Sequence, residues 1–130
     1  ENKIKVVLLE PGKLARTAEI GTSIEDLQNA VDGLIEPFYP FEEQVCIVCN
    51  DEGKINGMLP NRSVKNKDGV MVDFIFGPAF ICDCRGESFD SLSDEQIARY
   101  TKMFRYPEHL ARLNGKLIGI PFNPQREHER

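Results

Sequence analysis

The sequence predicts an α+β fold, a single domain with a mainly antiparallel or mixed sheet of about five to seven strands and two main helices. Three observations lead to this prediction. Short apolar runs bounded by turn residues recur along the chain, two segments carry capped helical patterns, and no repeat, linker or low-complexity tract divides the chain. Its 130 residues suit one domain, which we assign to residues 1–124. We expect residues 125–130 to be a frayed tail.

The N-terminal pattern is that of a β-hairpin. Lys3–Leu9, KIKVVLL, alternates and then becomes continuously apolar, as in a strand that is buried on both faces. Pro11 and Gly12 give the following segment, EPGK, the signature of a type II turn. We therefore expect Leu14–Ile20 to return as an outer strand.

The first helix is expected between a polar cap and a glycine. Thr22 or Ser23 is the N-cap, acidic residues follow in the first turn, and Gly33 ends the helix. Its apolar residues fall at helical spacing, at Ile24, Leu27, Val31 and Leu34. This pattern predicts one amphipathic helix.

The middle of the chain is expected to be extended. Pro37 and Pro40 keep Ile35–Phe41 out of a helix, and Gln44–Cys49 has the pattern of a central strand. The polar segment Asn50–Lys54 is typical of a tight hairpin turn. We therefore expect this strand to be closed by a hairpin.

Two loops and two apolar runs follow. Ile55–Ser63, INGMLPNRS, has the composition of a loop, and a second polar loop is expected at Lys65–Gly69. Val70–Phe76 and Pro78–Cys84 have the apolar character of strands. Gly77 between them predicts a sharp bend or a bulge.

A capping box, Ser93–Gln96, predicts the start of the second helix. The apolar stripe of this helix consists of Ile97, Tyr100, Met103 and Phe104. Pro107 either stops the helix or opens a short further turn through Leu113. Lys116–Phe122 is expected to add a last strand.

Composition and charge exclude several classes of protein. The longest apolar runs are far shorter than the ~20 residues of a membrane span, and no signal peptide is visible, so we expect a cytoplasmic protein without membrane contact. The net charge is −5, and most of the excess acid lies in residues 1–50. This distribution disfavours non-specific binding to a nucleic-acid backbone, although residues 92–130 carry a net positive charge.

Four cysteines form a C-x-x-C at Cys46 and Cys49 and a C-x-C at Cys82 and Cys84. Four thiolates could form a zinc site. Both motifs lie in strand-like runs, however, where residues i and i+3 point to opposite faces of a sheet. We therefore expect buried, reduced thiols and no cofactor, with a metal site on the four cysteines as the alternative.

The segment INGMLPNRS supplies the first candidate binding site. Arg62 is a planar, charged donor suited to a carboxylate or phosphate, and Asn56 and Asn61 could orient a ligand beside Gly57. In the alternative, these residues shape a turn and Arg62 pairs with a nearby acid such as Asp51 or Glu52. The sequence leaves both open.

Two further surfaces are candidates. Arg99, Lys102 and Arg105 recur at every third position of the second helix, which predicts either a nucleic-acid-binding face or a solvated helix surface. Tyr39, held between two prolines, could contribute to a protein interface or cover the core.

Catalytic residues are scarce. No nucleophile elbow, metalloprotease motif or phosphate-binding loop occurs, and His109 is expected on the surface of a short turn. Asp73 lies in an apolar run, where we expect it to pair with Arg62 or Lys54. An enzymatic function is therefore not expected.

Several ordered blocks resemble a known family. These are LEPG, IEPFYPF, CNDEGKINGMLPNR and SLSDEQIARYTKMF, with the motif N-G-x-x-x-N-R at Asn56, Gly57, Asn61 and Arg62. They resemble a family of small uncharacterised proteins, a domain of unknown function, carried on conjugative transposons, plasmids and phages of Gram-positive bacteria. The resemblance covers most of residues 4–107 and implies a biological setting, not a chemistry.

Together these observations predict a non-enzymatic accessory protein of a mobile genetic element that binds a protein partner. The alternative is a nucleic-acid-associated regulator that uses the basic face of the second helix. A third alternative is a metal-binding or hydrolytic protein.

Overall fold

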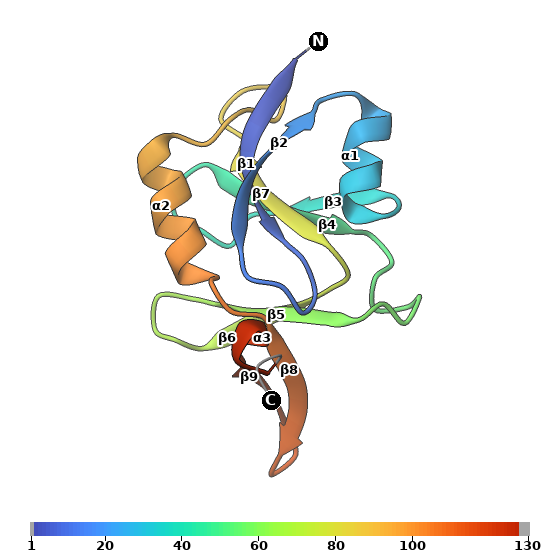
Figure 1. Cartoon of the computed structure of the whole chain (residues 1–130), viewed down its shortest axis with the longest axis vertical. Coiled ribbons are helices and arrows are strands. Elements are labelled where there is room, and N and C mark those ends of the chain that lie inside the picture. Colours follow the sequence, from blue (N-terminus) through green and yellow to red (C-terminus); the bar gives the residue numbers. More distant parts are fainter. Residues whose placement is uncertain (1, 128–130) are drawn as a thin grey trace.

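A five-stranded antiparallel sheet with one helix on each face forms the body of the protein in the computed structural model, which describes residues 2–127 (Figure 1). The sheet has the strand order β2-β1-β7-β4-β3, and every neighbouring pair is antiparallel. Two separate hairpins, β5–β6 and β8–β9, lie below it in Figure 1. The predicted α+β class and five-to-seven-stranded sheet are therefore confirmed.

The strands, in chain order, are β1 (Lys3–Leu9), β2 (Arg16–Gly21), β3 (Ile35–Phe38), β4 (Val45–Asn50), β5 (Pro60–Lys65), β6 (Met71–Phe76), β7 (Ala79–Asp83), β8 (Glu108–Leu113) and β9 (Lys116–Pro121). The helices are α1 (Ile24–Val31), α2 (Asp94–Met103) and the four-residue α3 (Pro124–Glu127).

Two apolar clusters cover the two faces of the sheet. On the α1 side, Leu27 and Val31 pack against strand residues such as Val6 and Phe80. On the α2 side, Tyr100 and Phe104 pack with strand residues that include Val7, Leu9, Ile47 and Ile81. Successive residues of a strand point to opposite faces, so a strand covered on both sides needs an unbroken apolar run. This requirement explains the continuous run VVLL in β1.

The β1–β2 turn and the N-cap of α1 are confirmed, whereas the left-handed residue that ends α1 is Asp32 and not the expected Gly33. The Lys13 N–H donates to the carbonyl of Glu10 at 3.2 Å, and Gly12 takes the positive φ that the β1–β2 turn requires. Ser23 caps α1 by accepting a hydrogen bond from the Asp26 amide, and Asp32 ends the helix in the left-handed conformation.

The second helix also begins as predicted. Ser93 and Gln96 form a complete capping box at the start of α2, and Tyr100 is its buried residue. The final strand is confirmed as β9, which pairs with β8. No helix among residues 2–127 is long and apolar enough to cross a membrane.

Four other local predictions were wrong or incomplete. Asn50–Lys54 does not close a hairpin, because β4 pairs with β3 and β7 and the chain continues through further turns to Gly57. Asn61 to Ser63 belong to strand β5 rather than to a loop.

Residues 108–113 form β8 instead of a helical turn, since they find a strand partner in β9. Residues 124–127 form α3, while 128–130 of the predicted tail lie outside the described residues.

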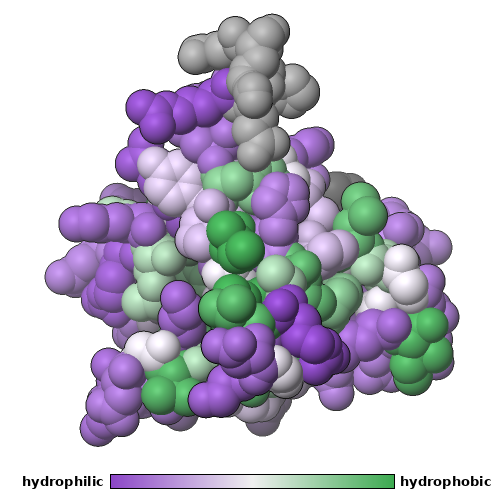
Figure 2. Space-filling view, turned by 90° about the horizontal axis from the view of Figure 1, so that it is seen from below, coloured by the Kyte–Doolittle hydropathy of each residue, from purple (hydrophilic) through white to green (hydrophobic). Residues whose placement is uncertain are grey.

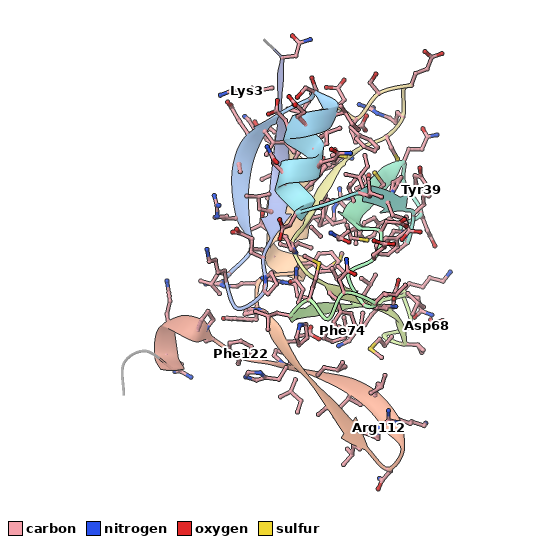
Figure 3. The ribbon with its side chains drawn as sticks, turned by 90° about the vertical axis from the view of Figure 1, so that its right-hand side faces the viewer. Lys3, Tyr39, Asp68, Phe74, Arg112 and Phe122 are labelled. Atoms are coloured by element: carbon pink, nitrogen blue, oxygen red, sulfur yellow. The ribbon has the colours of Figure 1, made fainter. Side chains whose placement is uncertain are left out.

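The β8–β9 hairpin projects from the body and carries exposed apolar side chains. Figure 3 shows Arg112 far out on this hairpin and Phe74 of β6 near its base. Leu113, Leu117 and Ile120 are each about half exposed. Figure 2, which views the molecule from the hairpin end, shows hydrophobic residues gathered near the centre of this face.

Candidate functional site

A groove of about 840 Å³ lies between α2, the segment before β4 and the β5–β6 hairpin. We call it the α2 groove. Its apolar lining consists of Pro40, Phe41, Tyr100, Met103 and Phe104, and its polar and charged lining includes Glu42, Glu43, Ser63, Lys65, Lys67, Asp68, Arg99 and Glu108. The ring of Phe41 lies 4.7 Å from that of Tyr100 between centroids, and 6.2 Å from that of Phe104. Tyr100 and Phe104 also belong to the buried apolar cluster on the α2 side, and Phe41 packs against that cluster. The core therefore fixes the position of the apolar wall.

One carboxylate organises the α2 side of the groove. Glu43 accepts hydrogen bonds from the Tyr100 hydroxyl, the Arg99 guanidinium and the Gln96 amide, the last at 3.0 Å. The Tyr100 hydroxyl is the main cause that holds the pKa of Glu43 below its usual value. Burial raises the pKa of Tyr100, and the hydrogen bond to the Glu43 carboxylate raises it further. Glu43 thus remains ionised and fixes the segment before β4 to α2.

The opposite side of the groove holds a buried hydroxyl without a partner. Ser63 is only 5% exposed, and its Oγ has no hydrogen-bond partner among the described residues. Its backbone N–H donates to Glu108 Oε1 at 3.0 Å, which connects β5 to β8. A buried hydroxyl without a hydrogen bond carries a desolvation cost that a ligand could remove. Within residues 2–127, Ser63 is therefore the lining residue of the α2 groove whose hydroxyl lacks a hydrogen bond, and that hydroxyl is itself buried.

Arg62, the preceding residue, points away from solvent and is fully buried. Its Nε donates to the carbonyl of Phe104 at 2.7 Å. Nη1 donates to the Glu10 carbonyl and to Asn61 Oδ1. Nη2 donates to the carbonyls of Lys13 and Arg105. All five guanidinium N–H groups are thereby used. Burial lowers the pKa of Arg62 to about 10, although Glu108 and Glu10 oppose that shift.

The structure therefore gives Arg62 the structural role that the sequence left open, with carbonyls in place of the expected acid. Asn61 is also fully buried, and its Nδ2 donates to the carbonyls of Leu9 and Gly77 at 2.9 and 2.8 Å. Neither side chain is accessible to a partner in this fold. Together they join β5 to the end of β1, to the β1–β2 turn and to the end of α2, and neither lines the α2 groove.

The remaining residues of the predicted binding set lie on the surface but are not brought together. Asn56 and Gly57 are exposed in the turns between β4 and β5, where Gly57 has a positive φ. Tyr39 is 63% exposed and projects from the segment after β3 (Figure 3). Neither Tyr39 nor the Asn56–Gly57 turn lines the α2 groove.

The three residues of the predicted basic face have different environments. Arg99 lines the α2 groove and is engaged by Glu43. Lys102 is exposed on α2. Arg105 follows the end of the helix and lies over the ring of Tyr106, at 5.5 Å from its centroid. The regular stripe of three cations is therefore interrupted by one ion pair and by the end of the helix.

The cysteines separate as the strand periodicity predicts. Cys46, Cys82 and Cys84 lie on the α1 side of the sheet, whereas Cys49 packs against the cluster on the α2 side. All four are free thiols, and among residues 2–127 no group of three or more metal-ligating side chains has a geometry that could hold a metal ion.

Two smaller expectations concern charged residues. Asp73 pairs with Lys54 at 3.0 Å, one of the two partners expected from the sequence. His109 lies on β8 and stacks on Phe122, with 4.0 Å between ring centroids, rather than on a helical turn. Neither residue lines the α2 groove.

The α2 groove itself was not anticipated from the sequence. Glu43, Tyr100, Ser63 and Glu108 come from segments up to 65 positions apart in the numbering, so no short motif could mark them. The one available signal was Tyr100 in an apolar helix stripe, because a buried tyrosine hydroxyl usually has a hydrogen-bond partner. That signal indicates a polar contact but not its location.

Comparison with known proteins identifies the family. The family model described as a domain of unknown function, DUF3846, matches residues 4–105. No curated protein and no solved structure matches the chain. The matched region contains the five-stranded sheet, α1, α2 and the β5–β6 hairpin, whereas β8, β9 and α3 follow it. The chain therefore belongs to the DUF3846 family of domains of unknown function.

Proposed function

We propose that this chain is a non-enzymatic binding protein that holds a segment of a partner protein in the α2 groove. The observation that carries the proposal is the buried, partnerless Ser63 hydroxyl in the wall of a groove with a partly apolar lining. A peptide supplies an apolar side chain for the aromatic wall and a backbone N–H or C=O for the hydroxyl, which the buried Ser63 side chain reaches by rotating toward the groove.

The charges around the groove favour a peptide over a nucleic acid. Lys65, Lys67 and Arg99 contribute positive charge, but four carboxylates, Glu42, Glu43, Asp68 and Glu108, lie among them. Carboxylates at this density repel a phosphate backbone. A polypeptide carries both signs of charge, so it can complement such a rim.

Met103 offers the best position at which to test the groove. It lines the groove at the end of α2 and is 55% exposed, so a charged replacement leaves the core intact. Leu34 is a matched control, because it is 58% exposed and lies outside the groove. We expect Met103→Glu to weaken binding of peptides selected on the wild-type protein by about tenfold or more, equivalent to ~1.4 kcal/mol, and Leu34→Glu to leave their affinity unchanged.

The measurement is a titration of each protein with the selected peptides, together with NMR shift mapping. Shifts centred on Ser63, Phe41 and Tyr100 would support the proposal. Equal affinity of the two variants, or shifts confined to another surface, would contradict it. Binding of duplex DNA that falls steeply with salt and disappears in Lys102→Ala would instead favour the nucleic-acid-associated regulator.

We further propose that the partner belongs to the transfer or maintenance machinery of a mobile genetic element. This part of the proposal is supported by the resemblance of the LEPG, IEPFYPF and N-G-x-x-x-N-R blocks alone. The test is the transfer frequency of an element that encodes this chain. Met103→Glu should lower that frequency as much as deletion of the chain does, while Leu34→Glu should not.

A further inference from the structure

Two thiols that are far apart in the sequence face each other across the centre of the sheet. Cys46 of β4 is the direct partner of Cys82 of β7, and their Sγ atoms are 3.7 Å apart. Both side chains are fully buried on the α1 side. This pair is not the C-x-x-C that the sequence displays, since Cys49 lies on the other face of the sheet.

The backbone at this pair permits a disulfide. The Cys84 amide donates to the Gln44 carbonyl at 3.0 Å, and hydrogen-bonded pairs recur at every second position of an antiparallel ladder. Cys46 and Cys82 therefore form a hydrogen-bonded pair, for which the Cα atoms are about 5.5 Å apart. That separation lies inside the usual disulfide range of roughly 4.4–6.8 Å. Bond formation needs rotation of both side chains and a small approach of the two strands, because the Cβ atoms of a disulfide lie closer together than those of most cross-strand pairs.

Cys84 gives this buried pair a route to solvent. It follows Cys82 by two residues, so it lies on the same face of the sheet, and it is only partly buried. Burial raises its pKa to about 11, and Cys46 adds to this shift. A hydrogen bond from Cys82 lowers the pKa of Cys46, which favours Cys46 as the thiolate of the three.

We propose that Cys84, Cys46 and Cys82 form an oxidation site. A peroxide is the oxidant, and the product is a Cys46–Cys82 disulfide that a reductant can reverse. The Cys84 thiolate attacks one peroxide oxygen, which breaks the O–O bond and yields the Cys84 sulfenic acid and, after proton uptake, water. The Cys46 thiolate then attacks the Cys84 sulfur and forms a Cys46–Cys84 disulfide, and hydroxide leaves as a second water.

A final exchange moves the bond into the core. The Cys82 sulfur attacks the Cys46 sulfur, the Cys46–Cys84 bond breaks, and the proton of Cys82 passes to the departing Cys84 thiolate. The hydrogen bond with Cys46, together with burial, raises the pKa of Cys82, so this exchange is slow. In total, two thiols lose two electrons and two protons, and one peroxide is reduced to two waters. Because the raised pKa of Cys84 keeps its thiolate scarce, the first step is slow and the site responds to sustained exposure. A dithiol reverses the reaction by the same exchange chemistry.

The test treats the folded full chain with hydrogen peroxide, then unfolds it in denaturant while alkylating the remaining thiols, because Cys46 and Cys82 are buried in the fold. Cross-linked peptides are identified by mass spectrometry. We expect the folded protein to lose two alkylatable thiols and to yield a Cys46–Cys82 cross-link that dithiothreitol removes. Cys49→Ser is the matched control and should behave as the wild type does. Cys84→Ser should reach the same cross-link about tenfold more slowly or worse, and Cys82→Ala should accumulate the Cys46–Cys84 bond.

Three results would overturn the proposal. The first is that all four thiols are still alkylated in denaturant after the folded protein has been treated with peroxide. The second is a cross-link that contains Cys49 or joins two chains. The third is oxidation of Cys84→Ser at the wild-type rate, which would remove Cys84 from the route. None of these outcomes depends on whether the α2 groove binds a peptide, so the two proposals can fail separately.

Discussion

At the scale of the residue, Arg62 connects segments that form the α2 groove, although its own side chain is buried and does not line the groove. Its guanidinium binds carbonyls of the β1–β2 turn and of the end of α2, while Ser63, the next residue, lines the α2 groove. Alternation along β5 produces this division, since adjacent side chains of a strand point to opposite faces. Asn61 and Arg62 thus stabilise the strand that carries Ser63, and they do not line the groove themselves.

We predict that Arg62→Lys destabilises the protein by about 2–4 kcal/mol. Lysine offers three donors on a flexible stem instead of five in a rigid plane, so buried carbonyls lose their partners. The measurement is urea unfolding at neutral pH, compared through the midpoint and slope. The matched control is Arg112→Lys, an exposed arginine on β8, which should change the stability by less than about 0.5 kcal/mol. A loss of stability as small as that of the control would contradict the structural role.

At the scale of the element, the turns between β4 and β5 are held against β6 at one glycine. A Cβ atom on Gly53 would lie 2.5 Å from the carbonyl oxygen of Phe76. The nearby Lys54–Asp73 ion pair joins the same two segments, but it is largely exposed and contributes little. Close packing of backbone on backbone therefore positions this segment, and with it the start of β5.

Gly53→Ala is therefore expected to cost about 1–3 kcal/mol, because backbone atoms cannot move aside as a flexible side chain can. Thermal or urea unfolding measures this loss. Gly86→Ala is the control, since a Cβ atom there meets nothing within 4 Å, and it should be neutral within about 0.5 kcal/mol. Equal stability of the two variants would show that the segment is free to shift away from β6.

At the scale of the whole molecule, the two apolar clusters lie within the region that the family model matches, and the β8–β9 hairpin follows that region. Within residues 2–127, neither apolar cluster contains a residue beyond Phe104, and the family match ends at residue 105. The β8–β9 hairpin follows and contacts the rest chiefly through β5. The contact includes the Ser63–Glu108 hydrogen bond and the packing of Phe74 near Gly119. An isolated two-stranded hairpin is marginal in water, so this contact holds it in place.

We predict that a chain ending after Tyr106 still folds, because both apolar clusters are complete without the hairpin. Its unfolding should stay cooperative, with a stability lower than that of the full chain by about 1–3 kcal/mol. Circular dichroism with urea unfolding measures both properties. Glu108→Ala in the full chain separates the lost hydrogen bond from the lost packing. A truncated chain without a cooperative transition would show that the two apolar clusters need the hairpin in order to fold.

The predictions from the sequence succeeded where neighbouring residues act on each other. The α1 and α2 caps, the β1–β2 turn and the opposite faces of Cys46 and Cys49 depend on interactions within a few residues. The errors came where a distant partner decides. Residues 108–113 became a strand because β9 pairs with them, and the expected β4 hairpin was replaced by pairing with β3 and β7.

The sequence by itself determined the α+β class, the starts of α1 and α2 and most of the strand-forming runs, since propensity, capping and periodicity are local properties. Only the tertiary structure decided that β7 lies between β1 and β4, that Arg62 is enclosed by carbonyls 42 to 52 positions away, and that Ser63 meets α2 across a groove. These arrangements depend on how two apolar clusters close around one sheet, which is a property of the whole chain. The same closure places Cys46 opposite Cys82.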